Sequence, residues 1–468
     1  MLLKCLWRFF ALFFLSISIV SGSSAQTPEN GSPKNDAGAT SVFSLTDLYK
    51  IALQHAEQIK IAEKELLIAE KDEDRAFAVL VPSLTAFGEY KRYDEAKISF
   101  PESSQAWGAR LDQRFTLNGR ELTGFQIAKD NIEKSRFDLD DARTGYLFNV
   151  AAAYYSVLKN QKGLEIAESD VKRLTAYKKA IQLRLDLKDT PKTELYRAEA
   201  ELSGSETALV AAANRLRYSR ITLARLVKLP MGYELELPDQ IKSERDYPST
   251  EQLIKTALAK RVDLKSLYMA DKISESEIDY YQGAHWPTLS LEGVYTGLDS
   301  EPESYYPDED SLHVGLSLNF PIFEGGLRSA EVSQARARKR QVELRLKDLA
   351  KQVRVEVEQT WLELQTAESA MASLEDRLKS AQENYTAVSQ RYQHGLADSL
   401  DVIDANSLLL QSEEGLLEAK YNYMLSVLNL ERAEGIFLDN IREKIRKQSP
   451  EYEGENDSSD LEYEGEDE

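Results

Sequence analysis

Residues 353–392 read VRVEVEQTWLELQTAESAMASLEDRLKSAQENYTAVSQRY, a run that no proline interrupts. Small or apolar side chains, with one threonine among them, recur at alternating steps of four and three residues: Val353, Val357, Thr360, Leu364, Ala367, Met371, Leu374, Leu378, Ala381, Tyr385, Val388 and Tyr392. A period of 3.5 residues held over this length predicts a coiled-coil seam, not the wider stripe of a globular helix. At 1.5 Å per residue, a helix from Gly325 to His394 would be a rod of roughly 105 Å.

The same rod occurs twice in the sequence. A shift of 207 residues maps Gly119 onto Gly326 and Val150 onto Val357. The chain is therefore predicted to be one unit written twice, with a helix from Leu45 to Val79 near its start. The predicted parts are repeat 1 over 44–230 (β-hairpin about 82–117, helical hairpin about 118–229), a connector over 231–250, and repeat 2 over 251–435 (β-hairpin about 287–324, helical hairpin about 325–434).

The two ends of the chain have their own composition. Lys4 and Arg8 precede an apolar run from Phe9 to Val20, and small residues follow up to Ala25. This pattern predicts a secretory signal peptide over residues 1–25, since the run is too short to favour the alternative of a transmembrane anchor. Residues 26–43, rich in Pro, Gly, Asn and Ser, are predicted to be disordered. Residues 436–468 are predicted to form an acidic C-terminal tail, with a short helix possible over 436–447.

Charge and cysteine content exclude some functions. The chain carries 58 basic and 79 acidic residues, a net charge of −21, which disfavours nucleic acid as a partner because its phosphates would be repelled. Cys5 is the single cysteine and lies in the predicted signal peptide, so no disulfide or N-terminal lipid is expected in a mature chain that starts near Gln26.

Each repeat also contains two segments in which apolar and polar residues alternate. In the clearest of them, Leu312, Val314, Leu316, Leu318 and Phe320 alternate with polar or small residues. Strands of about ten residues with one apolar face are typical of transmembrane β-strands, although a half-buried soluble hairpin would alternate in the same way. The second copy, the signal peptide and the rods favour a barrel. Four strands cannot close one, so several chains must share it.

Three local motifs carry a resemblance to a known family. They are Arg391-Tyr392-x-x-Gly395-x-x-x-x-x-Asp401-Val402-x-Asp404-Ala405, Asn319-Phe320-Pro321-Ile322-Phe323-x-Gly325-Gly326, and Ala257-Leu258-x-x-Arg261-x-Asp263-Leu264. With the duplication, they resemble the TolC-like outer membrane efflux protein family over about residues 44–435. The resemblance implies an α+β membrane protein: two tandem repeats of long coiled-coil α-hairpins plus a β-hairpin, trimerising into a shared 12-stranded β-barrel with a periplasmic α-helical barrel.

The same resemblance implies a function and partners. A homotrimer in the outer membrane of a Gram-negative bacterium, in contact with its lipid, would act as a passive exit duct. It would dock onto a periplasmic adaptor (membrane fusion protein) and an inner-membrane pump, or serve a type I secretion system. The hairpin tips would contact the adaptor through Arg391, Tyr392, Gly395, Arg184, Lys188 and Glu194. Repeat 1 departs from the pattern because Lys188 stands where repeat 2 has Gly395.

Two carboxylates follow the tip of repeat 2. Asp401 and Asp404 are three residues apart and share one helix face. The resemblance places the matching positions at the narrow periplasmic entrance of the pore, where three chains would contribute six carboxylates. Helix capping is the simpler interpretation, with Asp398 at the N-cap and Asp401 in the first turn.

Catalysis finds little support in the sequence. His55, His285, His313 and His394 are scattered without metal-ligand spacing, and we expect no catalytic residue, metal or cofactor. The competing interpretation is a secreted soluble coiled-coil scaffold or periplasmic adaptor, which would share the rods and the signal peptide but would not need the strand hairpins. The sequence does not identify the transported substrate.

Overall fold

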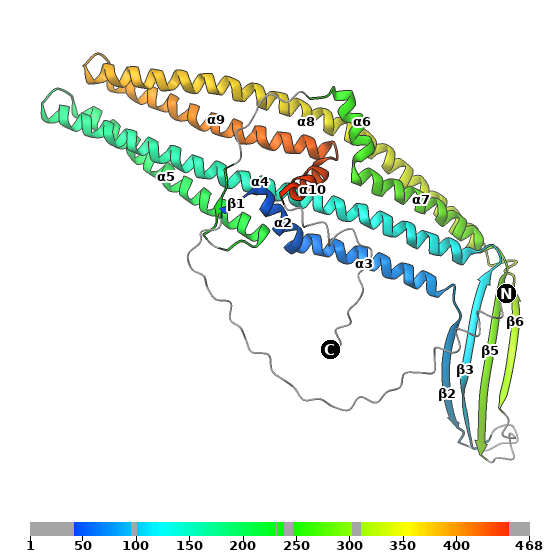
Figure 1. Ribbon diagram of the computed structural model, residues 1–468. Coiled ribbons are helices and arrows are strands. Elements are labelled where there is room, and N and C mark those ends of the chain that lie inside the picture. The colour runs from blue at the N-terminus through cyan, green and yellow to red at the C-terminus, as the bar shows by residue number, and fades with distance from the viewer. Residues whose placement is uncertain (1–41, 95–100, 231, 238–246, 302–309, 449–468) are drawn as a thin grey trace. The chain divides into compact units, whose positions relative to one another are not determined.

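The computed structural model describes residues 42–94, 101–230, 232–237, 247–301 and 310–448. One order of elements occurs twice within them (Figure 1). The first set is α2 (Leu45–His55), α3 (Glu57–Ala78), β2 (Ser83–Arg92), β3 (Ser103–Thr116), α4 (Arg120–Asp186) and α5 (Lys192–Val227). The second set is α6 (Thr250–Lys260), α7 (Val262–Gly283), β5 (Thr288–Glu301), β6 (Ser311–Asn319), α8 (Leu327–Gln393) and α9 (Ser399–Ala433). Three further elements are β1 (Val42–Phe43), β4 (Glu234–Leu235) and α10 (Phe437–Gln448).

The four long strands form one antiparallel sheet in the order β2-β3-β5-β6. Leu111 lies opposite Leu84 on one side and Gly293 on the other, so apolar residues of neighbouring strands share a face. This face is exposed: Leu312 is 75% and Val314 is 73% accessible. Alternation of the apolar residues therefore places them on a surface that nothing in the described chain covers.

Two helices of 67 residues each, α4 and α8, continue from the sheet. Helix α4 packs along α5 and α9, and α9 packs along α8, which gives the contact order α5–α4–α9–α8. The predicted seam is confirmed at Val353, Val357 and Leu364, which are at most 1% exposed. Thr360, Met371, Ala381 and Tyr392 of the same seam are also buried.

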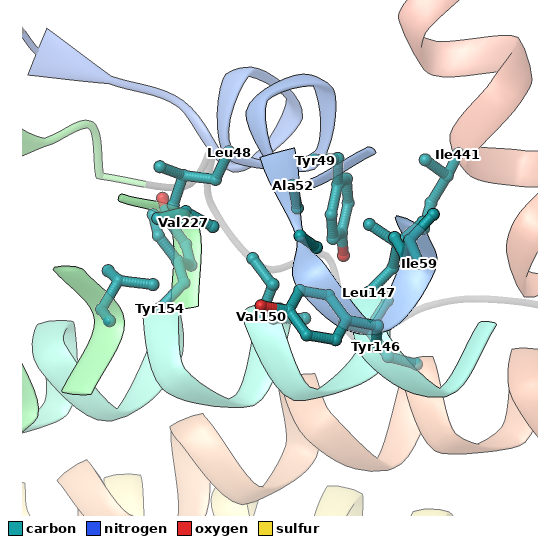
Figure 2. Packing of buried hydrophobic residues seen from close by; sticks show 14 of the residues in the cluster. Leu48, Tyr49, Ala52, Ile59, Tyr146, Leu147, Val150, Tyr154, Val227 and Ile441 are labelled. Carbon is teal, nitrogen blue, oxygen red and sulfur yellow. The ribbon is translucent and has the colours of Figure 1, made fainter. Parts of the chain in front are cut away.

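A compact apolar core lies where α2, α4, α5 and α10 meet (Figure 2). Leu48 of α2 lies beside Val227 of α5, and Ile441 of α10 lies beside Ile59 of α3. Leu48 is fully buried, and each such side chain stabilises the fold by about 1.5–3 kcal/mol. This core ties the last helix of the chain to the first.

The structure corrects several predicted boundaries. The helix expected from Leu45 to Val79 is two helices, because Ala56 takes an extended conformation (φ −67°, ψ 122°). Val42 and Phe43 lie in the segment 26–43 that the sequence predicts to be disordered, but they form β1, which pairs in parallel with β4 of the connector. The short helix expected over 436–447 is confirmed as α10 (Phe437–Gln448), in which Phe437, Leu438, Ile441 and Ile445 give one buried apolar face. The loop between the two strands of repeat 2 is expected over Leu298 to Ser311 but starts later, because β5 extends to Glu301.

Other predictions fall outside the described residues. They concern the signal peptide over 1–25, the disordered segment up to residue 41, residues 238–246 of the connector, the acidic loop residues 302–309 and the acidic tail over 449–468. Within the described ranges, no helix combines the length and the apolar character that a membrane crossing requires.

Candidate functional site

The tip of repeat 2 is a tight turn between α8 and α9. Gly395 has φ +72°, the left-handed conformation that glycine adopts without steric cost, and the Leu396 N–H donates to the Arg391 carbonyl at 2.9 Å. Helix α9 then begins with a capping box. The Asp398 carboxylate accepts from the Asp401 N–H at 2.9 Å, and the Asp401 carboxylate accepts from the Asp398 N–H at 3.1 Å.

The tip of repeat 1, between α4 and α5, has the same turn without a glycine. Lys188 has φ +63°, and the Asp189 N–H donates to the Arg184 carbonyl at 2.9 Å. A left-handed conformation costs a residue with a Cβ about 1–2 kcal/mol. The turn is closed by side chains, since the Arg184 guanidinium pairs with the Asp189 carboxylate at 3.1 Å. The backbone at Lys188 therefore has the same left-handed turn as the backbone at Gly395 in repeat 2.

The two tips meet through a tip cluster formed by Tyr177, Arg184, Glu194 and Tyr392. The Arg184 guanidinium lies 4.9 Å from the centroid of the Tyr392 ring, and the Tyr392 hydroxyl donates to Glu194 at 3.4 Å. The Tyr177 hydroxyl donates to the Ser399 carbonyl at 3.0 Å. Burial, with the neighbouring Glu194 carboxylate, raises the pKa of the Tyr392 hydroxyl and keeps it a donor. Four side chains from both repeats thus hold the tips together.

The remaining predicted site residues lie apart from this cluster. Arg391 is exposed and donates to the Leu396 carbonyl of its own turn at 3.2 Å. Lys188 is exposed at the end of α4, and Asp401 and Asp404 are exposed near the start of α9. Capping by Asp398 is confirmed, and Asp401 also serves the cap. Asp404 has no hydrogen bond or ion pair with another described residue.

A second polar cluster, which the sequence analysis missed, lies farther along the rods. This mid-rod cluster consists of Asp170, Arg173, Ser205, Asn406 and Glu413. The Asp170 carboxylate is 4% exposed and accepts from Ser205 at 2.5 Å and Asn406 at 2.8 Å. Arg173 reaches Asp170 at 3.3 Å and Glu413 at 3.1 Å. Its members come from α4, α5 and α9, and Arg173 and Glu413 are 240 residues apart, so no local pattern reveals them.

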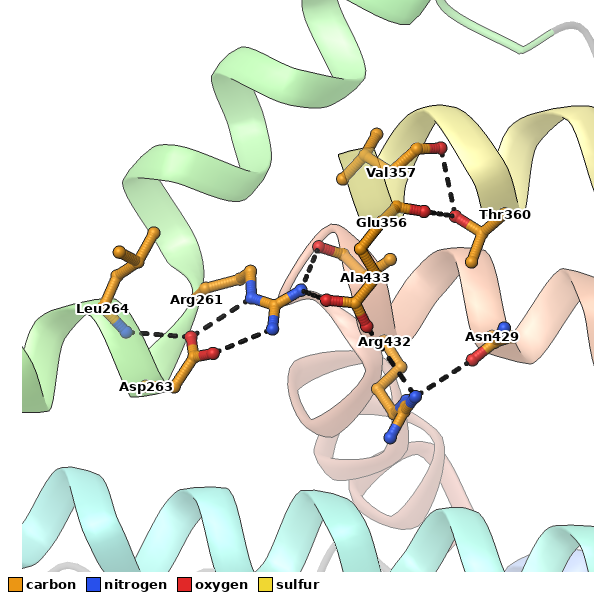
Figure 3. A network of polar contacts seen from close by, with 9 residues as sticks. All are labelled: Arg261, Asp263, Leu264, Glu356, Val357, Thr360, Asn429, Arg432 and Ala433. Atoms are coloured by element: carbon orange, nitrogen blue, oxygen red, sulfur yellow. Dashed lines mark hydrogen bonds and ion pairs between the residues drawn. The ribbon is translucent and has the colours of Figure 1, made fainter. Parts of the chain in front are cut away.

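A third cluster explains one of the family-like motifs (Figure 3). Arg261, at the bend between α6 and α7, pairs with Asp263 at 2.8 Å and with Glu356 of α8 at 2.6 Å. Its guanidinium also donates to the Ala433 carbonyl at the end of α9. Gly435, two residues after Ala433, has φ +75°, and a Cβ there would lie 2.7 Å from the backbone nitrogen of Arg261. The Arg-x-Asp motif therefore joins the start of repeat 2 to its end.

Fold and clusters together define a class of protein. A sheet with an exposed apolar face, continued by two helical hairpins that contact each other at their tips, is typical of a membrane protein with a large part outside the bilayer. The sequence matches the outer membrane efflux protein family over residues 48–227 and 253–435, and the chain belongs to this family. Members of this family are channels rather than enzymes, and the protein is an outer membrane duct for efflux or secretion with a large periplasmic part.

Individual relatives agree in extent. Outer membrane protein TolC of Vibrio cholerae serotype O1 is 24% identical over 401 residues, which are 81% of this chain and 89% of that protein. The proteases secretion protein PrtF of Dickeya chrysanthemi is 24% identical over 421 residues, 85% of this chain and 89% of that protein. The solved outer membrane channel CmeC of Campylobacter jejuni shares the fold, with a TM-score of 0.77 at 17% identity, over 92% of this chain and 98% of that one.

Proposed function

We propose that three copies of this chain close into one passive exit duct, in which each sheet supplies four strands of a 12-stranded barrel and the rods line a periplasmic tunnel. One observation carries this proposal. Within the described residues, β2 and β6 each pair with a single strand, while the sheet exposes an apolar face. Unpaired backbone groups are not tolerated in hydrocarbon, so lipid around this face requires that other strands pair with both edges.

The helices support the same assembly. Towards the tips, α5 and α8 are the outer members of the contact order α5–α4–α9–α8 (Figure 1). Both carry exposed apolar residues, including Tyr196 and Tyr218 on α5 and Val355 and Leu362 on α8. Packing α8 of one chain on α5 of the next buries these residues. Because such a contact joins two different surfaces, it closes into a ring only when the rotation per chain fits the number of chains.

The mass of the detergent-extracted protein tests this assembly. We expect a species of three chains in native mass measurement and conductance only from that species. A monomer that conducts ions would refute the proposal. Membrane extraction with carbonate tests the alternative of a soluble scaffold, which would be released, whereas a barrel would remain in the pellet.

The proposed partners are a periplasmic adaptor and an inner-membrane pump, or a type I secretion system. PrtF is named for protease secretion, which supports a role of this kind. We propose that the adaptor contacts the tips at Arg391, Tyr392, Gly395, Arg184, Lys188 and Glu194. Lys188 and Arg391 are the most informative of these, because both are exposed. Charge reversal at Lys188 and Arg391 should reduce co-purification of the adaptor and leave the trimer intact.

For the constriction, we propose that Asp401 and Asp404 narrow the periplasmic entrance and favour cations. Asp404 is the stronger member of the pair, since it is exposed and free of capping duty, whereas the Asp401 carboxylate is engaged by the Asp398 N–H. Rings of carboxylates of this kind select cations in other channels.

Conductance in planar bilayers separates this role from capping. Replacing Asp401 and Asp404 together by Ala should raise conductance and weaken both cation preference and block by multivalent cations. Asp398→Ala is the matched control, because it removes the N-cap at a cost of about 1 kcal/mol but leaves both proposed pore carboxylates in place. If the double variant conducts and selects like Asp398→Ala, the carboxylates only cap the helix.

A further inference from the structure

The end of α5 carries an unusual concentration of positive charge. Residues 207–230 contain Arg215, Arg217, Arg220, Arg225 and Lys228 and no acidic residue, in a chain whose net charge is −21. Lys228 pairs with Glu57 at 2.7 Å. None of the four arginines forms an ion pair with another residue in the part of the chain that the structure describes. This acidic protein therefore has four arginine side chains on one short segment that can pair with an anionic partner.

Two of these arginines line a cavity of about 270 Å³. Arg217 and Arg220 are three residues apart and share a helix face, and Tyr233 closes the cavity by donating its hydroxyl to the Arg220 carbonyl at 2.9 Å. Leu216 and Ile221 supply apolar walls. The Arg220 Nε atom is buried and has no hydrogen-bond partner among the described residues. The cavity therefore suits a ligand with two parts: an aromatic or apolar group that fits between its walls, and a negative charge that pairs with the arginines.

The chain itself contains a segment of that chemistry. Residues 449–468 hold ten acidic residues and no basic one, and the motif Glu-Tyr-Glu-Gly-Glu occurs in them twice, at 451–455 and at 462–466. Each motif places one tyrosine between carboxylates. A tyrosine ring can stack on an arginine guanidinium while the flanking carboxylates pair with its neighbours.

The attachment point of this segment lies close to the basic surface. Helix α10 ends at Gln448, and its last turn contributes Ile445 to the core that also contains Leu223 and Val227 of α5. Twenty residues can span at most roughly 65 Å, far more than the width of a helix, and both α2 and α4 pack against α10 and against α5. Tethering at this range gives an effective concentration of about a millimolar, so weak contacts suffice.

We propose that the acidic segment 449–468 docks on the basic surface of α5 in the same chain, with a tyrosine of one Glu-Tyr-Glu-Gly-Glu motif in the cavity between Arg217 and Tyr233. The cavity faces the segment around Gly232 and Tyr233. Tyr218, which is exposed and suits a neighbouring helix, does not line the cavity.

Disulfide trapping in the full-length protein tests this docking. The single cysteine, Cys5, lies in the predicted signal peptide, so introduced cysteines report without interference. Gly454→Cys or Gly465→Cys, which keep every tyrosine and carboxylate, should crosslink within one chain to Ala213→Cys. Ala337→Cys is the matched control, since Ala337 is exposed on α8 between Arg336 and Arg338 and samples positive charge without the cavity.

Charge reversal completes the test. Arg217→Glu with Arg220→Gln should reduce the crosslinked fraction about fivefold, as expected for the loss of one to two exposed ion pairs. Crosslinking to Ala213→Cys no greater than to Ala337→Cys would overturn the proposal, as would a product formed only between chains. If the arginine variants instead weaken the trimer and leave the crosslink unchanged, a second copy occupies this surface and the proposal is wrong.

Discussion

Asp170→Ala is the most demanding test of the structure of the rods. The carboxylate of Asp170 is 4% exposed and accepts hydrogen bonds from Ser205 of α5, Asn406 of α9 and Arg173 of its own helix. It is the one group of the mid-rod cluster that touches all three helices. The alanine variant removes the acceptor and leaves the helices free to separate at this level.

The size of the effect follows from the groups that lose their partner. The Ser205 hydroxyl and the Asn406 amide would each remain as a buried, unpaired donor, at a cost of about 1–3 kcal/mol per group. Arg173 keeps its ion pair with Glu413 at 3.1 Å, which limits the loss on that side. We therefore expect Asp170→Ala to destabilise this level of the rod by about 3–5 kcal/mol. Asp170→Asn keeps the shape and one acceptor and should cost about 1–2 kcal/mol.

Hydrogen exchange measured by mass spectrometry reports this local opening. Peptides from 165–177 and 402–414 should exchange faster by about 10²–10⁴-fold in Asp170→Ala, because local opening sets their rate. Glu168→Ala is the matched control: Glu168 is exposed on the same helix, and its loss should change exchange by no more than about twofold. Equal exchange in the two variants would refute the inference that the mid-rod cluster fastens the hairpins.

Three further predictions concern the junction of Figure 3 and its surroundings. Gly435→Ala should lower the stability by more than about 2 kcal/mol, since its Cβ would lie 2.7 Å from the backbone nitrogen of Arg261. Gly325→Ala, also at positive φ but with no atom within 4 Å of the added Cβ, should lose only the backbone cost of about 1–2 kcal/mol, and thermal midpoints compare the two. Burial, with the nearby Glu431, raises the pKa of the Glu434 carboxyl to about 7, so the folded chain holds a proton that the unfolded chain releases above about pH 4.5. The contribution of Glu434 to the free energy of unfolding should therefore be fully present below that pH and be lost as the pH rises to about 7. Glu434→Gln should flatten this part of the pH dependence, and an unchanged pH profile would contradict the assignment. Arg261→Lys should destabilise the same junction, because an ammonium cannot bind Asp263 and Glu356 as the guanidinium does, and circular dichroism melts would show it against Arg336→Lys on an exposed face.

Local sequence patterns predicted much of this architecture because its main elements are set by periodicity. The 3.5-residue seam at Val353, Val357 and Leu364 is buried as expected, and the period-2 segments are the strands. The helix breaks at Ala56 and Arg261 were not predictable, since neither is a glycine or proline. Ala56 is 2% exposed and Arg261 pairs with Glu356, which is 95 residues away. Tertiary contacts override helix propensity at both positions.

The polar clusters could not be predicted from local sequence patterns either, because their members are distant in the sequence. Arg173 and Glu413 are 240 residues apart, and Arg184 and Tyr392 are 208 residues apart. A period shows which face of a helix is buried, but it says nothing about which charged residue on a distant helix will lie opposite. The tip residues were found through their similarity to a family motif, and only the structure shows which of them touch.

The tips also show that duplication has not kept the two repeats equivalent. Arg184 and Arg391 occupy matching positions under the 207-residue shift, yet Arg391 donates to the Leu396 carbonyl of its own turn, whereas Arg184 lies against Tyr392 of the other repeat. Glu194 of repeat 1 accepts from the same tyrosine. Repeat 1 thus supplies the groups that hold the tip of repeat 2, and Lys188 remains exposed beside them. Any movement of the α8–α9 tip must therefore break contacts that repeat 1 provides, while the turn at Lys188 can stay in place.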